Sequence, residues 1–334
     1  MKLRQFFENR KNQVEQFAIR ENLDAIVFSN ELTAYWLGCG RTELVLFDQR
    51  SGWLYYDNDV IKNTIASIAA RRGKVGFDAG LKAVEILLLD PDRRIQWVSC
   101  GTQIARFMRI KDQIEVEALR LAAVTTRRAQ LAALNCATSN MTEQDVLNLI
   151  QCELSSPEDL IEWAFDPSVA TAGRIQHAWP GVTGRQIQPN APLLADIGVK
   201  VMGYCADVSE TIWVEPVQSD PRFRSFQSMM EFTRDLLDEM FSMEWVDQPV
   251  AKLAEWYKAK IDKSPFLHAP SAVYFGHGLG LRHHESPGIG AGSSDKLEKR
   301  MVLSIEPWIQ DKFSSNYRYE LPVVVGDSRI TPLE

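Results

Sequence analysis

Short apolar runs alternate with amphipathic stretches over the first hundred residues. Runs rich in β-branched and aromatic residues, typical of strands, occupy residues 23–30, 42–48, 52–57, 74–78 and 95–100. Between them, residues 60–71 and 81–89 have apolar positions at helical spacing, and Gly73 and Asp90 mark their ends. Strands interleaved with helices are typical of an α/β layer structure. We therefore predict a small α/β N-terminal domain over residues 1–108.

A long helical pattern follows at residues 111–134. Its expected buried face consists of Ile114, Ala118, Leu121 and Thr125. Its charged side chains are expected on the other faces: Glu115, Glu117, Arg127 and Arg128. Thr142, followed three residues later by Asp145, is typical of a helix start, and this second helix is expected to reach residue 154.

The remaining pattern mixes strands and helices. Strand-like runs occupy residues 168–171, 192–198, 203–214, 301–310 and 317–325. One helix is expected from Pro221, with a buried stripe of Phe223, Phe226, Met230, Thr233, Leu237 and Met240, and another over residues 250–261. We predict a larger α+β C-terminal domain over residues 109–334.

Composition narrows the class of protein. The 334 residues are 45% hydrophobic and 24% charged, which is ordinary for a globular protein. A net charge of −7 disfavours nucleic acid as a partner, because an acidic surface repels phosphate. The chain starts with a charged segment, and its apolar runs are too short to span a bilayer. The five cysteines include no C-x-x-C pair, which disfavours a disulfide framework. We expect a soluble cytoplasmic enzyme.

Two carboxylates interrupt apolar runs in the second domain. Asp196 lies within LLADIGV, where a strand is expected, and Asp207 follows eleven residues later. A turn within residues 198–203 would bring the two together as a hairpin. A buried carboxylate is costly unless it is paired or binds a cation, and two close carboxylates repel each other. The pair is consistent with a metal site, or with one of the two carboxylates being a surface charge or a turn cap.

Histidine and glycine concentrate further along the chain. Gly276, Gly278 and Gly280 surround His277, which favours close backbone packing beside an accessible imidazole. His283 and His284 follow within eight residues of His277. Of these, His283 best fits a structural turn position.

Two further acids interrupt apolar runs: Glu306 within MVLSIEPWI, and Glu320 just before LPVVV. Each alone is also consistent with an edge-strand charge. Together with Asp196, Asp207 and His277 they form a set of hard oxygen ligands with one imidazole. Such a set suits Mn²⁺, Co²⁺, Fe²⁺ or Zn²⁺, and four carboxylates can neutralise two divalent ions.

These residues resemble the motifs of the pita-bread metallopeptidases, the family of prolidase, aminopeptidase P, methionine aminopeptidase and creatinase. DIGVKVMGYCADVSETIWV resembles the family's strand pair, and GHGLGLRHHESP resembles its glycine–histidine segment. MVLSIEPWI and YRYE resemble its two glutamate strands, and RIKDQIEVEALRLA its linking helix. The resemblance covers roughly residues 105–325, and the layout is nearest to Xaa-Pro dipeptidase. It implies a C-terminal pita-bread (creatinase/aminopeptidase) domain preceded by a creatinase-type N-terminal domain.

The resemblance also implies a ligand set for two divalent metals, with manganese or cobalt as first choices and iron or zinc as alternatives. Asp207 and Glu320 would bridge the ions, Asp196 would bind one, and His277 and Glu306 would bind the other. A metal-bridging hydroxide would attack the substrate.

Catalytic and substrate roles follow from the same resemblance. Glu306 would shuttle a proton, and His284 would stabilise the tetrahedral oxyanion. His177 would contact the substrate. Arg318 would bind a substrate carboxylate or anchor acids that lie behind the metal ligands. The family also implies a homodimer acting on a small peptide.

Three departures from the family pattern concern the substrate. Val273 replaces a histidine, the loop from Gly173 to His177 is short, and residues 209–211 carry Glu210 in place of a basic side chain. All are expected near the substrate. The leading hypothesis is hydrolysis of Xaa-Pro bonds. The alternatives are a metalloenzyme of the same fold acting on a non-proline amide or related small molecule, as hydrolase or lyase, and a non-catalytic binding module.

Overall fold

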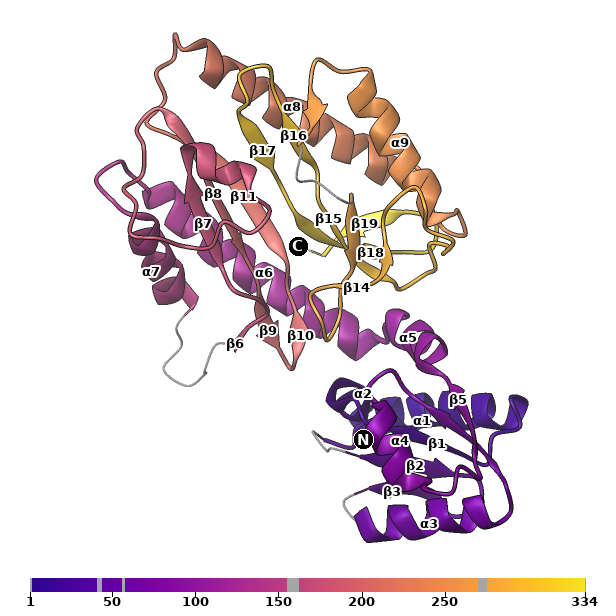
Figure 1. Cartoon of the computed structure of the whole chain (residues 1–334). Helices are drawn as coiled ribbons and strands as arrows, with labels where there is room; N and C mark the ends of the chain where they lie inside the picture. Colours follow the sequence, from indigo (N-terminus) through magenta and orange to yellow (C-terminus); the bar gives the residue numbers. More distant parts are fainter. Residues whose placement is uncertain (1, 41–43, 56–57, 155–161, 270–274, 334) are drawn as a thin grey trace. The chain divides into compact units, whose positions relative to one another are not determined.

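The computed structural model describes residues 2–40, 44–55, 58–154, 162–269 and 275–333. Contacts divide the chain into two compact units, Met1–Met108 and Arg109–Glu334. Figure 1 shows the elements of each unit. Both units mix helices with sheets, so the predicted α/β and α+β classes are confirmed.

Unit 1 is built on a five-stranded sheet in the order β3-β2-β1-β4-β5. The strands are β1 (Ala25–Phe28), β2 (Val45–Asp48), β3 (Gly52–Tyr55), β4 (Lys74–Phe77) and β5 (Gln96–Ser99). They lie inside the five predicted runs. The helices are α1 (Lys2–Arg20), α2 (Glu31–Trp36), α3 (Asn58–Ala70), α4 (Ala83–Leu89) and α5 (Gly101–Arg109). The sequence pattern missed α1, because charged and amide side chains dominate it and only a short stripe around Val14 and Phe17 is buried.

Unit 2 contains two larger sheets that carry the candidate chemistry. One has the order β11-β8-β7, and the other β14-β13-β15-β18-β19. Their strands are β7 (Ser168–Thr171), β8 (Ala191–Ile197), β11 (Val208–Val214), β13 (Gly276–Gly278), β14 (Glu285–Gly288), β15 (Val302–Ile305), β18 (Leu321–Val325) and β19 (Ile330–Pro332).

Among its described residues, two small sheets and five helical segments complete unit 2. The small sheets have the orders β10-β9-β6 and β12-β16-β17. Their strands are β6 (Glu162–Trp163), β9 (Val199–Val201), β10 (Tyr204–Cys205), β12 (Leu267–His268), β16 (Trp308–Gln310) and β17 (Asn316–Arg318). The helical segments are α6 (Gln113–Cys136), α7 (Glu143–Leu154), η1 (Ala172–Gln176), α8 (Pro221–Ser242) and α9 (Val250–Asp262).

The register of β8 and β11 determines where the two aspartates lie. These strands pair antiparallel, with Asp196 opposite Ser209. The small hairpin β9–β10 connects them and turns at Met202 and Gly203, whose φ angles are 50° and 77°. Two successive positive φ angles suit the twist of a tight hairpin. The predicted turn within residues 198–203 therefore overlaps the observed one, and it places Asp207 immediately before β11.

The two larger sheets meet where β11 reaches Glu320. Ser209 and Glu320 form an isolated antiparallel bridge, with N–O distances of 3.4 and 3.1 Å. Beside it, the hydroxyl of Thr211 donates to the carbonyl of Arg318 at 2.8 Å and accepts from its N–H at 3.1 Å. We call this contact between Ser209/Thr211 and Glu320/Arg318 the seam.

Helices cover both larger sheets. Side chains of α6 and α7 pack with β7, β8 and β11, and side chains of α8 and α9 pack with β15 and β18. Figure 1 shows α6 running along the strands of the first sheet. None of the described helices is long and apolar enough to cross a bilayer.

Two helical faces differ from prediction. On α6 the buried positions include Ala118, Leu119 and Ala122, whereas Leu121 is 52% exposed. Small alanines let α6 approach the strands closely, so the face of α6 that contacts the strands is rotated away from Leu121. On α8, Met229 is buried and Met230 is 39% exposed.

Candidate metal centre

Three carboxylates converge at the seam. Asp196 lies on β8, Asp207 just before β11, and Glu320 just before β18. One oxygen of each lies within 4.8 Å of the others, and all three residues are buried. Buried carboxylates at this spacing repel one another strongly unless protons or a cation neutralise them.

His277 faces this group from β13. Its Nδ1 lies 2.9 Å from the carbonyl oxygen of Gly278, to which only a protonated nitrogen can donate. Its Nε2 lies 2.7 Å from Oε1 of Glu306 and 3.3 Å from Oδ2 of Asp207. The flanking glycines have a steric role, since a Cβ on Gly276 would lie 2.0 Å from the carbonyl oxygen of Ser304.

The donor set fits a divalent cation. With the proton of the neutral ring on Nδ1, Nε2 presents a lone pair to two carboxylates. Within the described part of the chain, His277 Nε2, Glu306 Oε1 and Asp196 Oδ1 are buried without a hydrogen-bond partner. In the neutral ring, a metal ion would take the place of the proton that neutralises these facing donors in the metal-free protein.

The pKa values of the buried groups indicate that the metal-free centre lacks positive charge. Burial raises the pKa of Asp196 to about 7, although Arg318 opposes this effect. Burial likewise raises the pKa of Glu320 well above its ordinary value. For His277, burial lowers the pKa, but the charges of Glu306 and Asp207 outweigh it and raise the pKa to about 11. Without metal, the site therefore holds protons in place of a cation.

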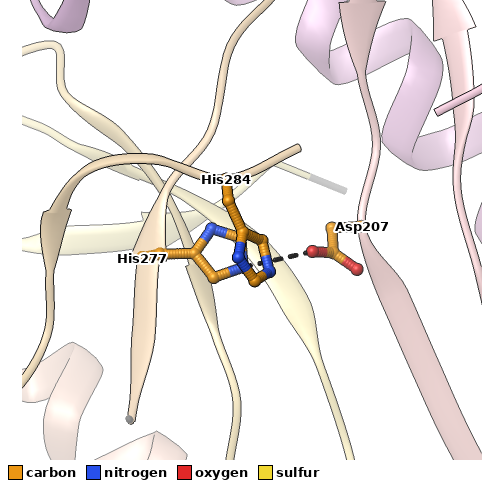
Figure 2. A group of neighbouring side chains, drawn as sticks. All are labelled: Asp207, His277 and His284. Atoms are coloured by element: carbon orange, nitrogen blue, oxygen red, sulfur yellow. Dashed lines mark ion pairs between the residues drawn. The ribbon is translucent and has the colours of Figure 1, made fainter. Parts of the chain in front are cut away.

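His284 lies against the ring of His277. Figure 2 shows the two imidazoles with Asp207, and their ring centroids are 3.8 Å apart. One donor atom of each of these three residues lies within 4.8 Å of the others. Burial and the neighbouring His277 lower the pKa of His284 to about 4. At neutral pH its imidazole is neutral, so it can donate one hydrogen bond or act as a further ligand.

Arg318 anchors the acids from β17. Its Nη2 donates to Oδ2 of Asp196 at 2.8 Å, and its Nη1 donates to the carbonyl oxygen of Ala178 at 2.8 Å. Its Nε lies 3.7 Å from Glu320. Arg318 thus anchors acids, as one of its two expected roles proposed, but these acids are the candidate ligands Asp196 and Glu320 rather than acids behind them.

A cavity of about 700 Å³ opens onto this centre. It is lined by Phe165, Asp166, Ser168, Ala178, Trp179, Gly181, Asp196, Asp207, His283, His284, Glu306, Trp308, Arg318 and Glu320. Its lining combines aromatic and acidic side chains. A cavity of this size and composition suits a small ligand.

The cavity wall differs from the predicted substrate contacts. His177 is exposed and does not belong to the described lining, whereas the next two residues, Ala178 and Trp179, do. Trp179 is 77% exposed at the cavity. Trp179 was not among the predicted site residues, although an aromatic residue beside proline in a polar loop is a usable signal.

Glu210 lies away from the candidate substrate pocket, contrary to prediction. Its carboxylate contacts the hydroxyl of Tyr317 at 3.3 Å and lies 3.6 Å from Arg127. It lines a separate cavity of about 520 Å³ beneath α8. Side chains alternate along a strand, so Ser209 faces the metal centre and Glu210 the opposite side. Val273 lies outside the described residues.

Comparisons with known proteins agree with this geometry. The pattern of metallopeptidase family M24 matches residues 117–327. The Xaa-Pro dipeptidase of Lactobacillus delbrueckii subsp. lactis is 25% identical over 211 residues, which are 62% of this chain and 54% of that protein. The match thus spans about half the length of that relative.

Solved structures extend the likeness of fold to both units. The prolidase of Pyrococcus horikoshii OT3 superposes with a TM-score of 0.80 at 17% identity, covering 97% of each chain. The Xaa-Pro dipeptidase of Bacillus anthracis has a TM-score of 0.82 at 18% identity, covering 98% of this chain and 97% of that one. With the family pattern matched over most of unit 2, the chain belongs to metallopeptidase family M24, the pita-bread family.

Proposed function

We propose that this protein is a metal-dependent peptidase that hydrolyses small peptides at Xaa-Pro bonds. The observation that carries the proposal is the convergence of His277 Nε2 with the carboxylates of Glu306 and Asp207, at 2.7 and 3.3 Å. The family supports peptide hydrolysis, and the names of the relatives support proline specificity.

Five residues would hold two divalent ions: Asp196, Asp207, His277, Glu306 and Glu320. When bound, the ions would supply Lewis acidity and a water molecule of lowered pKa. Manganese and cobalt are the first choices, because carboxylates with a single imidazole suit them, with iron and zinc as alternatives.

The surrounding side chains would orient the substrate and move protons. Glu306, the least buried of the five ligand residues, would exchange a proton between water and the leaving amine. His284, neutral at neutral pH, would donate a hydrogen bond to the oxyanion as the peptide carbonyl is attacked. Trp179 and Phe165 would pack against the apolar part of the peptide and exclude water.

The decisive experiment is release of free proline from a panel of Xaa-Pro dipeptides. The full chain is stripped of metal and reconstituted separately with Mn²⁺, Co²⁺, Fe²⁺ and Zn²⁺. Metal-dependent proline release is expected. A protein that binds two ions but releases proline from no peptide would reject the Xaa-Pro specificity and direct the search to other amides. The expected homodimer and cytoplasmic location stay predictions.

A further inference from the structure

The candidate metal ligands come from opposite sides of the seam. Asp196 and Asp207 belong to the first sheet, whereas Glu320, His277 and Glu306 belong to the second sheet or its ends. In the described residues, the backbone hydrogen bonds between the strands of these two sheets are those of the bridge at Ser209 and Glu320. One more joins the segments at the ends of the sheets, where the N–H of Cys205 donates to the carbonyl oxygen of Gly280 at 2.8 Å. A small opening at this bridge would therefore change the spacing of the ligands directly.

Arg127 of α6 spans this bridge. Its Nη2 donates to the carbonyl oxygen of Glu320 at 2.6 Å, and its Nη1 donates to that of Ser209 at 3.2 Å. One guanidinium thus binds the main chain on both sides of the seam. It lies on the side of β11 that carries Glu210, opposite the metal centre.

Gln130, one helical turn further along α6, continues the contact. Its Nε2 donates to the carbonyl oxygens of Ala195 at 2.9 Å and Val208 at 3.2 Å, and its Oε1 accepts from Arg127 at 2.7 Å. Ala195 directly precedes Asp196, and Val208 directly follows Asp207. The two side chains of α6 therefore bind the main chain at or beside three of the candidate ligands.

Burial makes these contacts costly to lose. Gln130 is fully buried and Arg127 is 7% exposed. The Arg127 guanidinium lies 4.8 Å over the ring of Tyr319 and 3.6 Å from Glu210. A buried charge needs a full set of partners, and a guanidinium presents its donors in a rigid fork that an ammonium does not reproduce.

We infer that Arg127 is a positioning residue that holds the two halves of the metal centre at their working distance from the far side of the sheets. Gln130 supports it by holding Arg127 and the strands that carry Asp196 and follow Asp207. The expected effect on metal binding rests on the proposed function, whereas the contacts of Arg127 and Gln130 do not depend on it. Residues that orient metal ligands without touching the metal commonly change affinity or activity about 10- to 100-fold when they are replaced.

The first test uses the metal-free full chain and needs no activity. Hydrogen exchange is compared for wild type, Arg127→Lys and Gln130→Met, with Arg128→Gln as control because Arg128 is exposed on the same helix. In Arg127→Lys we expect the amides of Ser209 and Glu320 to exchange about tenfold faster or more, while amides in the middle of β8 stay unchanged. Exchange at wild-type rates in both variants would overturn the inference.

The second test is a titration of the same proteins with Mn²⁺ and Co²⁺. We expect the weaker of two binding constants to fall about tenfold or more in Arg127→Lys, with kcat reduced and KM little changed. Unchanged constants beside faster exchange would also overturn the inference, because the seam would then not position the ligands. If Arg127→Lys does not fold, the exchange rates and binding constants of Gln130→Met serve as the test. If wild type binds no metal, the proposed function fails, and the exchange rates alone decide whether these side chains hold the seam.

Discussion

Arg318 forms a buried ion pair with Asp196, with Nη2 and Oδ2 separated by 2.8 Å. The second arm of the same guanidinium holds the carbonyl oxygen of Ala178, next to Trp179. Arg318 thus joins a candidate metal ligand to the loop that forms the cavity wall. A change at this one side chain is therefore expected to affect both metal binding and substrate binding.

Replacement of Arg318 by lysine tests this coupling. A lysine retains the charge but cannot hold Asp196 and Ala178 at once, since it lacks the planar fork. We expect metal affinity to fall about 10- to 100-fold and KM to rise. Metal titration and steady-state kinetics measure the two effects, with Arg329→Lys on the exposed surface as control. A variant with wild-type metal affinity would show that the ion pair does not support the centre.

Asp207 is expected to bridge two ions. Asp207→Asn removes its charge at nearly constant volume, so a bridged pair can no longer be held and the metal content should fall from about two ions per chain to one or fewer. Elemental analysis of the purified variant measures this. Asp235→Asn, on the exposed face of α8, serves as control. Full metal content in Asp207→Asn would contradict the bridging role.

His284 is expected to act on the substrate rather than to hold the metal. His284→Ala should lower kcat on the order of 10²-fold, as for loss of an oxyanion donor, and leave the metal content near that of wild type. Kinetics and elemental analysis of one preparation separate the two roles. Metal loss together with lost activity would instead make His284 a ligand, as its short distance to His277 also allows.

Trp179 is expected to contribute to substrate binding alone. Because its side chain is largely exposed, Trp179→Ala should leave the melting temperature unchanged. KM for the substrate should rise about 3- to 30-fold with kcat nearly constant, as for loss of an interaction made equally in ground and transition states. Phe313→Ala, an exposed aromatic outside the described lining of the pocket, is the control. An unchanged KM would remove Trp179 from the binding site.

The raised pKa of Asp196 predicts that the stability of the metal-free protein depends on pH. Burial raises its pKa to about 7 from an ordinary value of 3.8, so the folded state favours the protonated form. Its contribution to stability is then full below about pH 3.8 and is lost as the pH rises through 7.

Urea unfolding between pH 4.5 and 7.5 tests this sign. The free energy of unfolding of metal-free wild type should fall with rising pH relative to that of Asp196→Asn. Added Mn²⁺ should oppose the fall, because the metal binds the ionised carboxylate. Parallel stability curves for the two metal-free proteins would contradict the raised pKa.

The metal-ligand candidates were predictable because each carries a local signal. Asp196 and Glu306 interrupt apolar strands, and His277 lies among glycines whose missing side chains make room for neighbouring backbone. Such positions are visible in sequence because a charge in an apolar strand needs a compensating partner. The positions were predictable, and their metal roles stay predictions.

Contacts between distant segments were not predictable. Arg127 was expected away from the buried face of its helix, but it is buried and binds carbonyl oxygens 82 and 193 residues away, and no pattern around it indicates those partners. The orientation of Glu210 depends on which face of β11 meets the metal centre, which a family motif alone does not state. The rotation of α6 that exposes Leu121 depends on the strands against which it packs.

Because the candidate ligands come from two sheets, bound metal would stabilise the fold as well as support catalysis. In the proposed holoenzyme the ions cross-link segments that are more than a hundred residues apart, so the unfolded chain cannot reproduce the site. Metal bound only to the folded state would add roughly 2.7 kcal/mol of stability per site at a free concentration one hundred times its Kd. The amount of intact protein would then follow the supply of metal in the cell, and chelation would expose the chain to proteolysis as well as stop catalysis.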